Sequence, residues 1–221
     1  MLYIVSTPIG NLKDITLRAL ETLKKVDLIA AEDTRHTRKL LSRYGIHTAL
    51  TSYFEHNKFT KGAHIIKLLK QGRDVALVSD SGTPGISDPG FRLIRLAQES
   101  GIEISACPGP SALVNALILS GLPTNRFIFE GYLPVKSGAR KRRLKEVSEE
   151  KRTILFYESP HRMLKALSDM QEALGEREIA VLREMTKKFE QALKGTSAFL
   201  LAHFQKQPPR GEFVIAIDGK R

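Results

Sequence analysis

Two short clusters of charged residues carry side chains suited to moving a proton. They are Glu32-Asp33-Thr34-Arg35-His36 and Glu158-Ser159-Pro160-His161-Arg162, and each follows a predicted strand and opens a predicted helix. Carboxylate and imidazole groups are common general bases, and a guanidinium stabilises a developing oxyanion. Without choosing which group accepts the proton, we take as candidate catalytic residues Glu32, Asp33, Arg35, Glu158 and His161.

Each cluster also has a purely structural interpretation. Asp33 or Thr34 could cap the first helix, and Glu32 could form an ion pair with Arg35 or Arg38. In the second cluster, Ser159-Pro160 is a natural helix start, which would leave His161 as an ordinary surface residue. Both interpretations stay open at this stage.

Three loops rich in glycine, proline and hydroxyl side chains could hold a small molecule. They follow predicted strands and read STPIGN from Ser6, SDSGTPGISDPG from Ser79, and CPGPSA from Cys107. Glycine lets backbone amides approach a ligand closely, and proline fixes the shape of a loop beforehand. Because ligands of open α/β sheets gather at the carboxyl ends of strands, we expect these loops to meet there around a flat, polar molecule. Helix capping by Ser87 or Asp88 would explain only part of the second loop.

The usual glycine signatures of nucleotide sites are missing from the sequence. It contains no Gly-x-Gly, and therefore no dinucleotide fingerprint, and it contains no Gly-x-x-x-x-Gly-Lys-Ser/Thr phosphate loop. A ligand held by the three loops would be met by backbone groups in an atypical arrangement.

The elements that must position these residues alternate between strands and helices. Strands are predicted at 2–5, 28–31, 50–54, 75–78 and 102–106, and helices at 15–25, 34–44, 63–69, 91–99 and 112–119. This alternation predicts βαβ units and a mostly parallel sheet. A second cycle follows, with strands at 127–132, 153–157, 179–185, 189–194 and 213–217 and helices at 137–150, 160–174 and 196–205. We therefore predict an α/β protein with two α/β domains, 1–118 and 119–221, and a cleft between them.

The composition narrows the class of protein. With 42% hydrophobic and 27% charged residues, the chain is expected to be a soluble globular protein. The sequence has no apolar run of the roughly 18 residues that a membrane span needs, and its first residues lack the basic start of a signal peptide. The single cysteine, Cys107, excludes an internal disulfide and a cysteine-rich metal site. We expect a cytoplasmic protein with no metal and no membrane partner.

The chain is strongly basic, with a formal net charge of +11 at pH 7. Such a charge favours a polyanionic partner such as RNA, although it also promotes solubility. The densest stretch, from Lys136 to Arg152, holds eight basic residues in seventeen positions. Phosphate contacts from a helix of this kind would raise RNA affinity without reading sequence; a merely solvated helix face is the alternative.

Seven motifs, taken together, resemble one known family. In chain order they are STPIGNLKDIT, AAEDTRHTRKLL, VSDSGTPGISDPG, CPGPSAL, EGYLP, FYESPHR and GEFVIAI. They resemble the ribosomal RNA small subunit methyltransferase I family of the tetrapyrrole methylase superfamily, over essentially the whole chain. The resemblance implies two α/β domains of the tetrapyrrole methylase type with S-adenosylmethionine in the cleft between them and S-adenosylhomocysteine as product. It further implies a homodimer that methylates the ribose 2′-hydroxyl of a cytidine in the decoding region of 16S rRNA, in the small ribosomal subunit.

The resemblance also implies roles for individual residues. The first loop reads Thr7-Pro8-Ile9-Gly10, where many members of the superfamily have a glycine-rich loop. The implied cofactor-binding residues are Pro8, Ile9, Gly10, Asp80, Ser81, Gly82, Thr83, Pro84, Gly85, Ile86, Ser111, Ala112, Phe156 and Tyr157. We expect substrate contacts from His36, Arg38, Lys136, Arg140, Lys141, Arg142, Arg143 and Arg162.

Two other functions compete with rRNA methylation. One is methylation of a tetrapyrrole or another small molecule on the same fold, for which the basic stretch has no obvious use. The other is a non-catalytic RNA-binding or assembly module that binds S-adenosylmethionine and transfers nothing.

Overall fold

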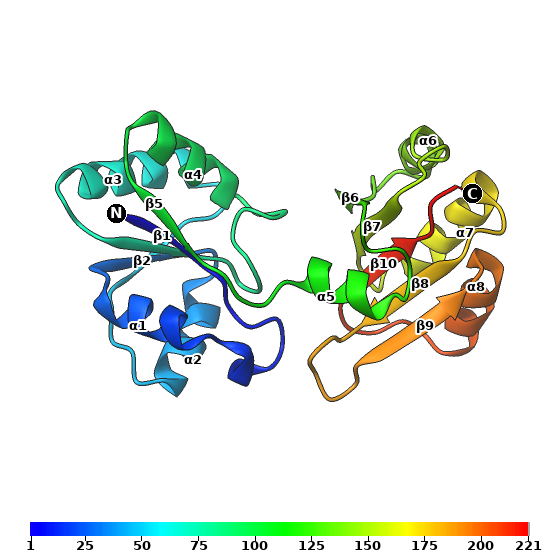
Figure 1. The fold of residues 1–221 in the computed structure, drawn as a ribbon, viewed down its shortest axis with the longest axis horizontal. Helices are drawn as coiled ribbons and strands as arrows, with labels where there is room; N and C mark the ends of the chain where they lie inside the picture. Colours follow the sequence, from blue (N-terminus) through cyan, green and yellow to red (C-terminus); the bar gives the residue numbers. More distant parts are fainter. Residues whose placement is uncertain (221) are drawn as a thin grey trace. The chain divides into compact units, whose positions relative to one another are not determined.

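The computed structural model describes residues 1–220, and the chain forms two compact units. The first unit is Met1–Ser111, and the second begins at Ala112. Each is an α/β structure with its own five-stranded sheet (Figure 1), which confirms the predicted fold class. The division falls just before helix α5 (Ala112–Leu119). The domain boundary expected after residue 118 stays a prediction.

The strands of the first unit are all parallel, as predicted. They are β1 (Leu2–Val5), β2 (Leu28–Ala31), β3 (Leu50–Ser52), β4 (Val75–Val78) and β5 (Ile104–Cys107), in the order β3-β2-β4-β1-β5. The connections contain a short 3-10 helix, η1 (Leu12–Asp14), and the helices α1 (Leu17–Lys25), α2 (Thr34–Arg43), α3 (Lys58–Lys70) and α4 (Gly90–Glu99). Because the strands are parallel, the loops that follow them all lie at one edge of the sheet.

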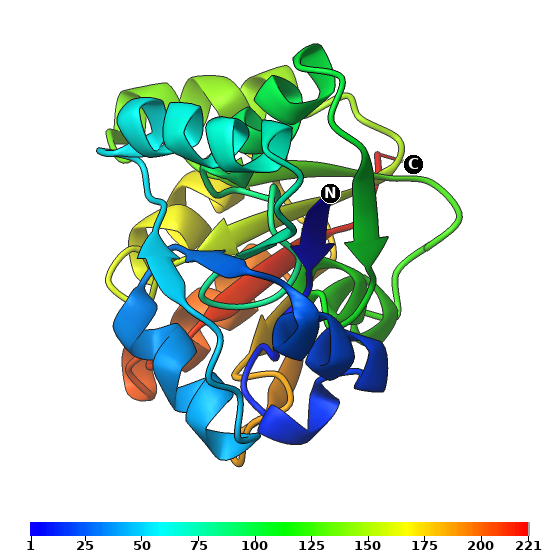
Figure 2. The same cartoon turned by 90° about the vertical axis from the view of Figure 1, so that its left-hand side faces the viewer.

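Alternate strand residues supply two cores on opposite faces of this sheet. On β4, Ala76 and Val78 pack with α1 and α2, whereas Val75 and Leu77 pack with α3 and α4. Figure 2 shows the strands of this unit between the blue helices α1 and α2 and the cyan helix α3. Burial on both faces explains why these strands read as continuous apolar runs in the sequence.

The second unit has a mixed sheet, and here the expectation of a mostly parallel sheet is wrong. Its strands are β6 (Phe127–Tyr132), β7 (Thr153–Glu158), β8 (Ile179–Arg183), β9 (Gln191–Gly195) and β10 (Phe213–Ile217), in the order β6-β7-β10-β8-β9. Only β6 and β7 are parallel; β10 is antiparallel to both of its neighbours, and β8 and β9 form a hairpin. The short connection from β8 to β9 has no room for the crossover that parallel pairing requires.

Three helices cover one face of the second sheet, and α5 packs against β10. They are α6 (Ser137–Glu146), α7 (Met163–Leu174) and α8 (Ser197–Lys206). Two of them are shorter than predicted. α6 ends at Glu146, before the buried Val147, and α7 begins only after a turn in which the Arg162 amide donates to the Ser159 carbonyl at 3.1 Å.

Candidate functional site

Three loops meet at the carboxyl edge of the first sheet, as their sequence positions predicted. Strands β4, β1 and β5 are neighbours, so the loops that follow them start side by side. Thr7 and Gly82 exchange two backbone hydrogen bonds, of 2.9 and 3.0 Å, which tie the first loop to the second. The Thr83 hydroxyl lies 3.0 Å from the Ser6 hydroxyl and 3.4 Å from the Pro110 carbonyl oxygen, which links all three loops.

The second loop needs backbone angles that favour glycine. Gly82 and Gly85 have positive φ values of 76° and 91°. Ser87, which is not a glycine, also has a positive φ, of 64°. A Cβ atom on Gly85 would lie 3.1 Å from the Ile94 side chain. The Asp88 carboxylate holds the bend, because it accepts hydrogen bonds from the amides of Gly85 and Gly90. The N-cap residue of α4 (Gly90–Glu99) is Pro89, with no side-chain cap bond, so neither Ser87 nor Asp88 is the N-cap, in contrast to the expectation; Asp88 instead joins the start of the helix to the bend at Gly85.

The third loop is packed closely against the first. A Cβ atom on Gly109 would lie 3.0 Å from the Cβ of Ser6, so a larger residue would push the two loops apart. Ser6 and Thr7 are themselves buried, and the Thr7 hydroxyl donates to the Ser79 carbonyl at 3.2 Å. Pro8 and Ile9 are also buried, whereas Gly10 is exposed. Ser6 and Thr7 are not among the cofactor residues expected from the sequence, although their hydroxyl groups stand next to those residues in the first loop.

A fourth loop joins this edge through the first charged cluster. It follows β2, the neighbour of β4, and the Asp33 amide donates to the Asp80 carboxylate at 2.9 Å. Glu32 lies half-buried in the same region. Burial raises the pKa of Glu32, and the nearby negative charges of Asp80 and, more weakly, Asp88 raise it further.

Asp33 has the opposite electrostatic environment. Arg35 binds its carboxylate with two side-chain hydrogen bonds, of 3.1 and 2.8 Å, and the Arg35 amide adds a third of 2.8 Å. These bonds hold the pKa of Asp33 far below its ordinary value. Asp33 is also the N-cap of α2, as its structural interpretation predicted. His36 and Arg38 lie on exposed turns of α2.

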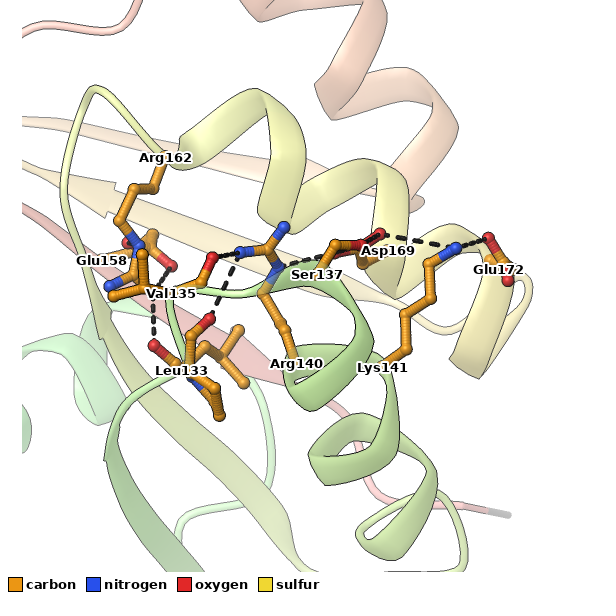
Figure 3. Close-up of polar contacts among 10 residues, drawn as sticks. Leu133, Val135, Ser137, Arg140, Lys141, Glu158, Arg162, Asp169 and Glu172 are labelled. Carbon is orange, nitrogen blue, oxygen red and sulfur yellow. Dashed lines mark hydrogen bonds and ion pairs between the residues drawn. The ribbon is translucent and has the colours of Figure 1, made fainter.

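The second charged cluster centres on a buried ion pair. The Glu158 side chain is fully buried; its carboxylate lies 3.0 Å from Arg162 Nε and accepts the Ser159 amide at 2.7 Å. Arg162 also donates to the Leu133 carbonyl (Figure 3). Burial raises the pKa of Glu158, while the Ser159 amide and Arg162 act in the opposite direction. His161 is exposed.

The two expected cofactor contacts from the second unit lie in different environments. Phe156 is completely buried in the core of that unit. Tyr157 is half-buried, and its ring contacts Phe129 and Tyr132 edge-on, with centroids 4.8 and 5.6 Å away. Of these two residues of β7, only Tyr157 has a side chain that is exposed enough to contact a ligand.

Arg140 is a buried structural residue of α6, in contrast to the surface role expected for it. Its side chain is 2% exposed, and its Nε donates to Asp169 at 2.6 Å. Its Nη1 donates to the carbonyls of Pro134 and Val135, and the Ser137 hydroxyl also donates to Asp169 (Figure 3). Arg140 is therefore not available to contact a phosphate.

The other basic residues of this stretch differ in their exposure and in whether they form ion pairs with carboxylates. Lys136 and Arg142 are exposed. Lys141 donates to Glu172 at 2.5 Å, and Arg143 bridges Glu130 and Glu146. Because surface ion pairs of this kind are weak, Lys141 and Arg143 could exchange their carboxylates for phosphates.

The remaining loop residues differ in their exposure to solvent. In the second loop Asp80 and Thr83 are partly exposed and Ser81 and Ile86 exposed, while Gly82 and Pro84 are buried. Ser111 and Ala112, at the end of the third loop, are partly exposed. Among residues 1–220, no group of three metal-ligating side chains lies together, and no helix is long and apolar enough to span a membrane.

Comparison with known proteins identifies relatives over the whole chain. Residues 1–200 match the family described as Tetrapyrrole (Corrin/Porphyrin) Methylases. The chain is 52% identical to the ribosomal RNA small subunit methyltransferase I of Haemophilus influenzae, covering 100% of this chain and 79% of that protein. It is 50% identical to the protein of the same name from Synechocystis sp. (99% and 79%) and 48% identical to that from Thermotoga maritima (99% and 98%).

Solved structures share the fold at much lower identity. A cobalt precorrin-4 methyltransferase superposes with a TM-score of 0.70 at 18% identity, covering 98% of this chain and 94% of that one. A uroporphyrin-III-C-methyltransferase from Thermus thermophilus gives 0.66 at 19%, with coverage of 97% and 93%. At these identities the likeness concerns the fold alone.

Proposed function

The chain belongs to the tetrapyrrole methylase family, and from this premise we propose that it is an S-adenosylmethionine-dependent methyltransferase of the small-subunit ribosomal RNA. The proposed acceptor is the ribose 2′-hydroxyl of a cytidine in the decoding region of 16S rRNA. The observation that carries the proposal is the identity of about one half, over nearly the full chain, to relatives named ribosomal RNA small subunit methyltransferase I.

The loop edge of the first unit fits the proposed cofactor. Its tied loops combine the exposed residues Ser81 and Ile86 with the buried apolar side chain of Ile9, while the amides of Gly82 and Gly85 are bonded within the loops and fix their shape. An adenine ring needs an apolar surface and backbone hydrogen bonds, and a carboxylate needs amide donors. The carboxylates of Glu32 and Asp80 add negative charge near this edge, which suits a ligand with a sulfonium and an ammonium group. When bound, S-adenosylmethionine supplies an electrophilic methyl group.

Glu32 is the residue that we propose as general base. A carboxylate with a raised pKa holds a proton more strongly than an ordinary one, so it is better matched to removing the proton of a hydroxyl group. Asp33 suits this role less, because the Arg35 pair lowers its pKa. Glu158 is enclosed and paired with Arg162. We propose that Arg35 and His161, both exposed, contact the RNA.

The basic surface of α6 is the proposed contact for RNA phosphates. Lys136 and Arg142 are exposed, and Lys141 and Arg143 can leave their surface ion pairs. Arg140 is left out of this surface because it is buried against Asp169. We further propose that the protein acts as a homodimer in the cytoplasm; analytical ultracentrifugation of the purified protein tests the dimer.

Methylation of a tetrapyrrole or a similar small molecule is the second candidate. It is favoured by the names of the two solved methyltransferases described above, a uroporphyrin-III and a cobalt precorrin-4 enzyme, which share the fold at under 20% identity. Reversing the charge of Lys136 and Arg142 separates the two candidates. RNA methylation should weaken, whereas turnover of a small substrate should not change.

Methyl transfer from labelled S-adenosylmethionine to unmethylated small ribosomal subunits tests the proposed function. We expect label on the ribose of one cytidine of 16S rRNA, found by nuclease digestion and mass spectrometry. Label on a base, or label only on an added tetrapyrrole, would contradict the proposal. S-adenosylmethionine binding without transfer to any ribosomal particle would favour a non-catalytic module.

A further inference from the structure

Exposed aromatic side chains lie at the first turns of α3 and α4, beside the cofactor loops. Phe59 is 62% exposed and Phe91 is 63% exposed. The guanidinium carbon of Arg92 lies 4.0 Å from the centre of the Phe59 ring, so a cation and an aromatic ring are stacked at the surface. We call this pair the Phe59–Arg92 stack.

The charge of Arg92 has no partner in the described part of the chain. Within residues 1–220 it forms no ion pair with a carboxylate, and its Nε is buried without a hydrogen-bond partner. The ammonium group of Lys58 lies 5.7 Å from the centre of the same ring. An arginine held over a ring, with no carboxylate to neutralise its charge, is suited to meeting an anionic or π-rich ligand.

Hydrogen bonds and packing contacts fix the turns that precede α3 and α4, which carry the stack. Tyr53 is 1% exposed, and its hydroxyl lies 3.4 Å from the Pro89 carbonyl at the start of α4. The Asn57 side chain closes the turn before α3, because it accepts the Phe54 amide at 2.8 Å and donates to Ser52. α3 and α4 also pack directly on one another. The two partners of the stack are thus set on fixed elements.

The position of the stack connects it with the proposed reaction. α3 follows β3, and α4 begins directly after the second cofactor loop, where Asp88 binds the Gly90 amide. In a parallel sheet both of these helix starts lie at the carboxyl edge. A group held by the stack would therefore lie at the same edge of the unit as the tied loops.

We propose that the Phe59–Arg92 stack is a platform on which an unpaired base of the RNA substrate stacks. This inference rests on the proposed function and names a substrate contact for it. Single-stranded RNA is recognised by stacking of its bases on aromatic rings and guanidinium planes, with cations around them for the phosphates. The stack offers a ring and a guanidinium, and Lys58, which is paired with Glu55, and Lys61 lie on the first turn of the same helix α3.

An apolar protein surface would be a poorer occupant. It would cover the Arg92 guanidinium without neutralising it, and burying an unpaired charge is costly. A stacked base leaves the edge of the guanidinium open to phosphate and water. The observations therefore favour RNA, and a protein partner becomes an outcome of the test.

The experiment compares F59L, F59Y and R92K with the wild-type protein. Leucine keeps an apolar side chain and removes the π face, tyrosine keeps the ring, and lysine keeps the charge without the plane. Phe189 provides the control, F189L, because it is 65% exposed with the Lys188 ammonium 5.7 Å from its ring centre, but no arginine of residues 1–220 is stacked on it. The probe is a short single-stranded RNA containing 2-aminopurine, whose fluorescence falls on stacking. Methyl transfer to small ribosomal subunits is measured in parallel.

We expect F59L to weaken RNA binding about tenfold, as loss of one base–aromatic stack does elsewhere. R92K should weaken it by a smaller factor, and F59Y and F189L should stay within about twofold of the wild type. S-adenosylmethionine affinity and thermal unfolding should not change, because Phe59 is exposed. Wild-type quenching and affinity in F59L would overturn the inference while the proposed function stands.

Two further outcomes separate the inference from the proposed function. Quenching by the wild type that F59L loses, without methyl transfer to any ribosomal particle, would overturn the proposed function and leave the platform standing. A defect of F59L on ribosomal subunits with normal quenching of the RNA probe would overturn the platform. That result would point to a ribosomal protein as the occupant.

Discussion

Loss of Arg140 should destabilise the protein strongly, even though the residue belongs to the most basic stretch of the chain. In an R140Q variant the carboxylate of Asp169, 9% exposed, would keep the hydroxyl of Ser137 and the more distant ammonium of Lys141, at 3.8 Å, but lose the 2.6 Å bond from Arg140. The carbonyls of Pro134 and Val135 would lose a donor as well. Removing one partner of a buried ion pair typically costs about 3–5 kcal/mol, because the other charge stays buried.

The assay is urea unfolding followed by circular dichroism, with R142Q as the matched control. Arg142 is exposed two positions further along the same helix, so R142Q should change the free energy of unfolding by less than about 0.5 kcal/mol. It should instead lower the dependence of RNA binding on log salt by about one. The double variant R140M/D169L should regain most of the lost stability, because it removes both buried charges. Unfolding of R140Q at the same urea concentration as the wild type would contradict a stabilising role for the buried Arg140–Asp169 pair.

Three other changes test the site. G82V should reduce S-adenosylmethionine affinity at least a hundredfold by calorimetry, whereas G72V, with a similar φ but nothing within 4 Å of its Cβ position, should bind normally; equal affinities would show that the site is elsewhere. E32Q should lower the methylation rate about 10²–10⁴-fold and abolish the rise of that rate with pH. Because the pKa of Glu32 is raised in the folded state, ionisation of Glu32 lowers the free energy of unfolding at pH values above that pKa. At neutral pH, E32Q should therefore have a higher free energy of unfolding than the wild type. This difference between the two proteins should vanish in acid. K136E/R142E should weaken RNA methylation and leave cofactor affinity unchanged; an unaltered rate at physiological salt would remove α6 from the RNA surface.

The first sheet could be predicted from sequence because each of its strands is a continuous apolar run followed by a helical pattern. Val75 to Val78 is such a run, and its alternate residues enter the two cores. The direction of the strands in the second unit was not predictable in the same way. β10 enters the sheet between β7 and β8, and this long-range pairing leaves no trace in the local pattern of Phe213 to Ile217.

The loops of the site were predictable, but the state of single charged residues was not. Three bends after neighbouring strands must meet at one edge of a parallel sheet, and they do. Arg140, in contrast, was grouped with its basic neighbours. A helical-face analysis would have placed it with Leu144 and Val147, which are both buried and lie four and seven residues further on. Its partner Asp169 is distant in sequence, so only the tertiary structure could reveal the pair.

The paired amides of Thr7 and Gly82 have a consequence for the thermodynamics of ligand association. Loops that are free in solution lose conformational entropy when a ligand orders them, and this loss weakens the complex. Here the two bends are already joined when the strands assemble, so most of that entropy is lost during folding of the first unit. The free energy of ligand binding is then not reduced by the ordering of these loops, and it can hold the bound ligand in one orientation.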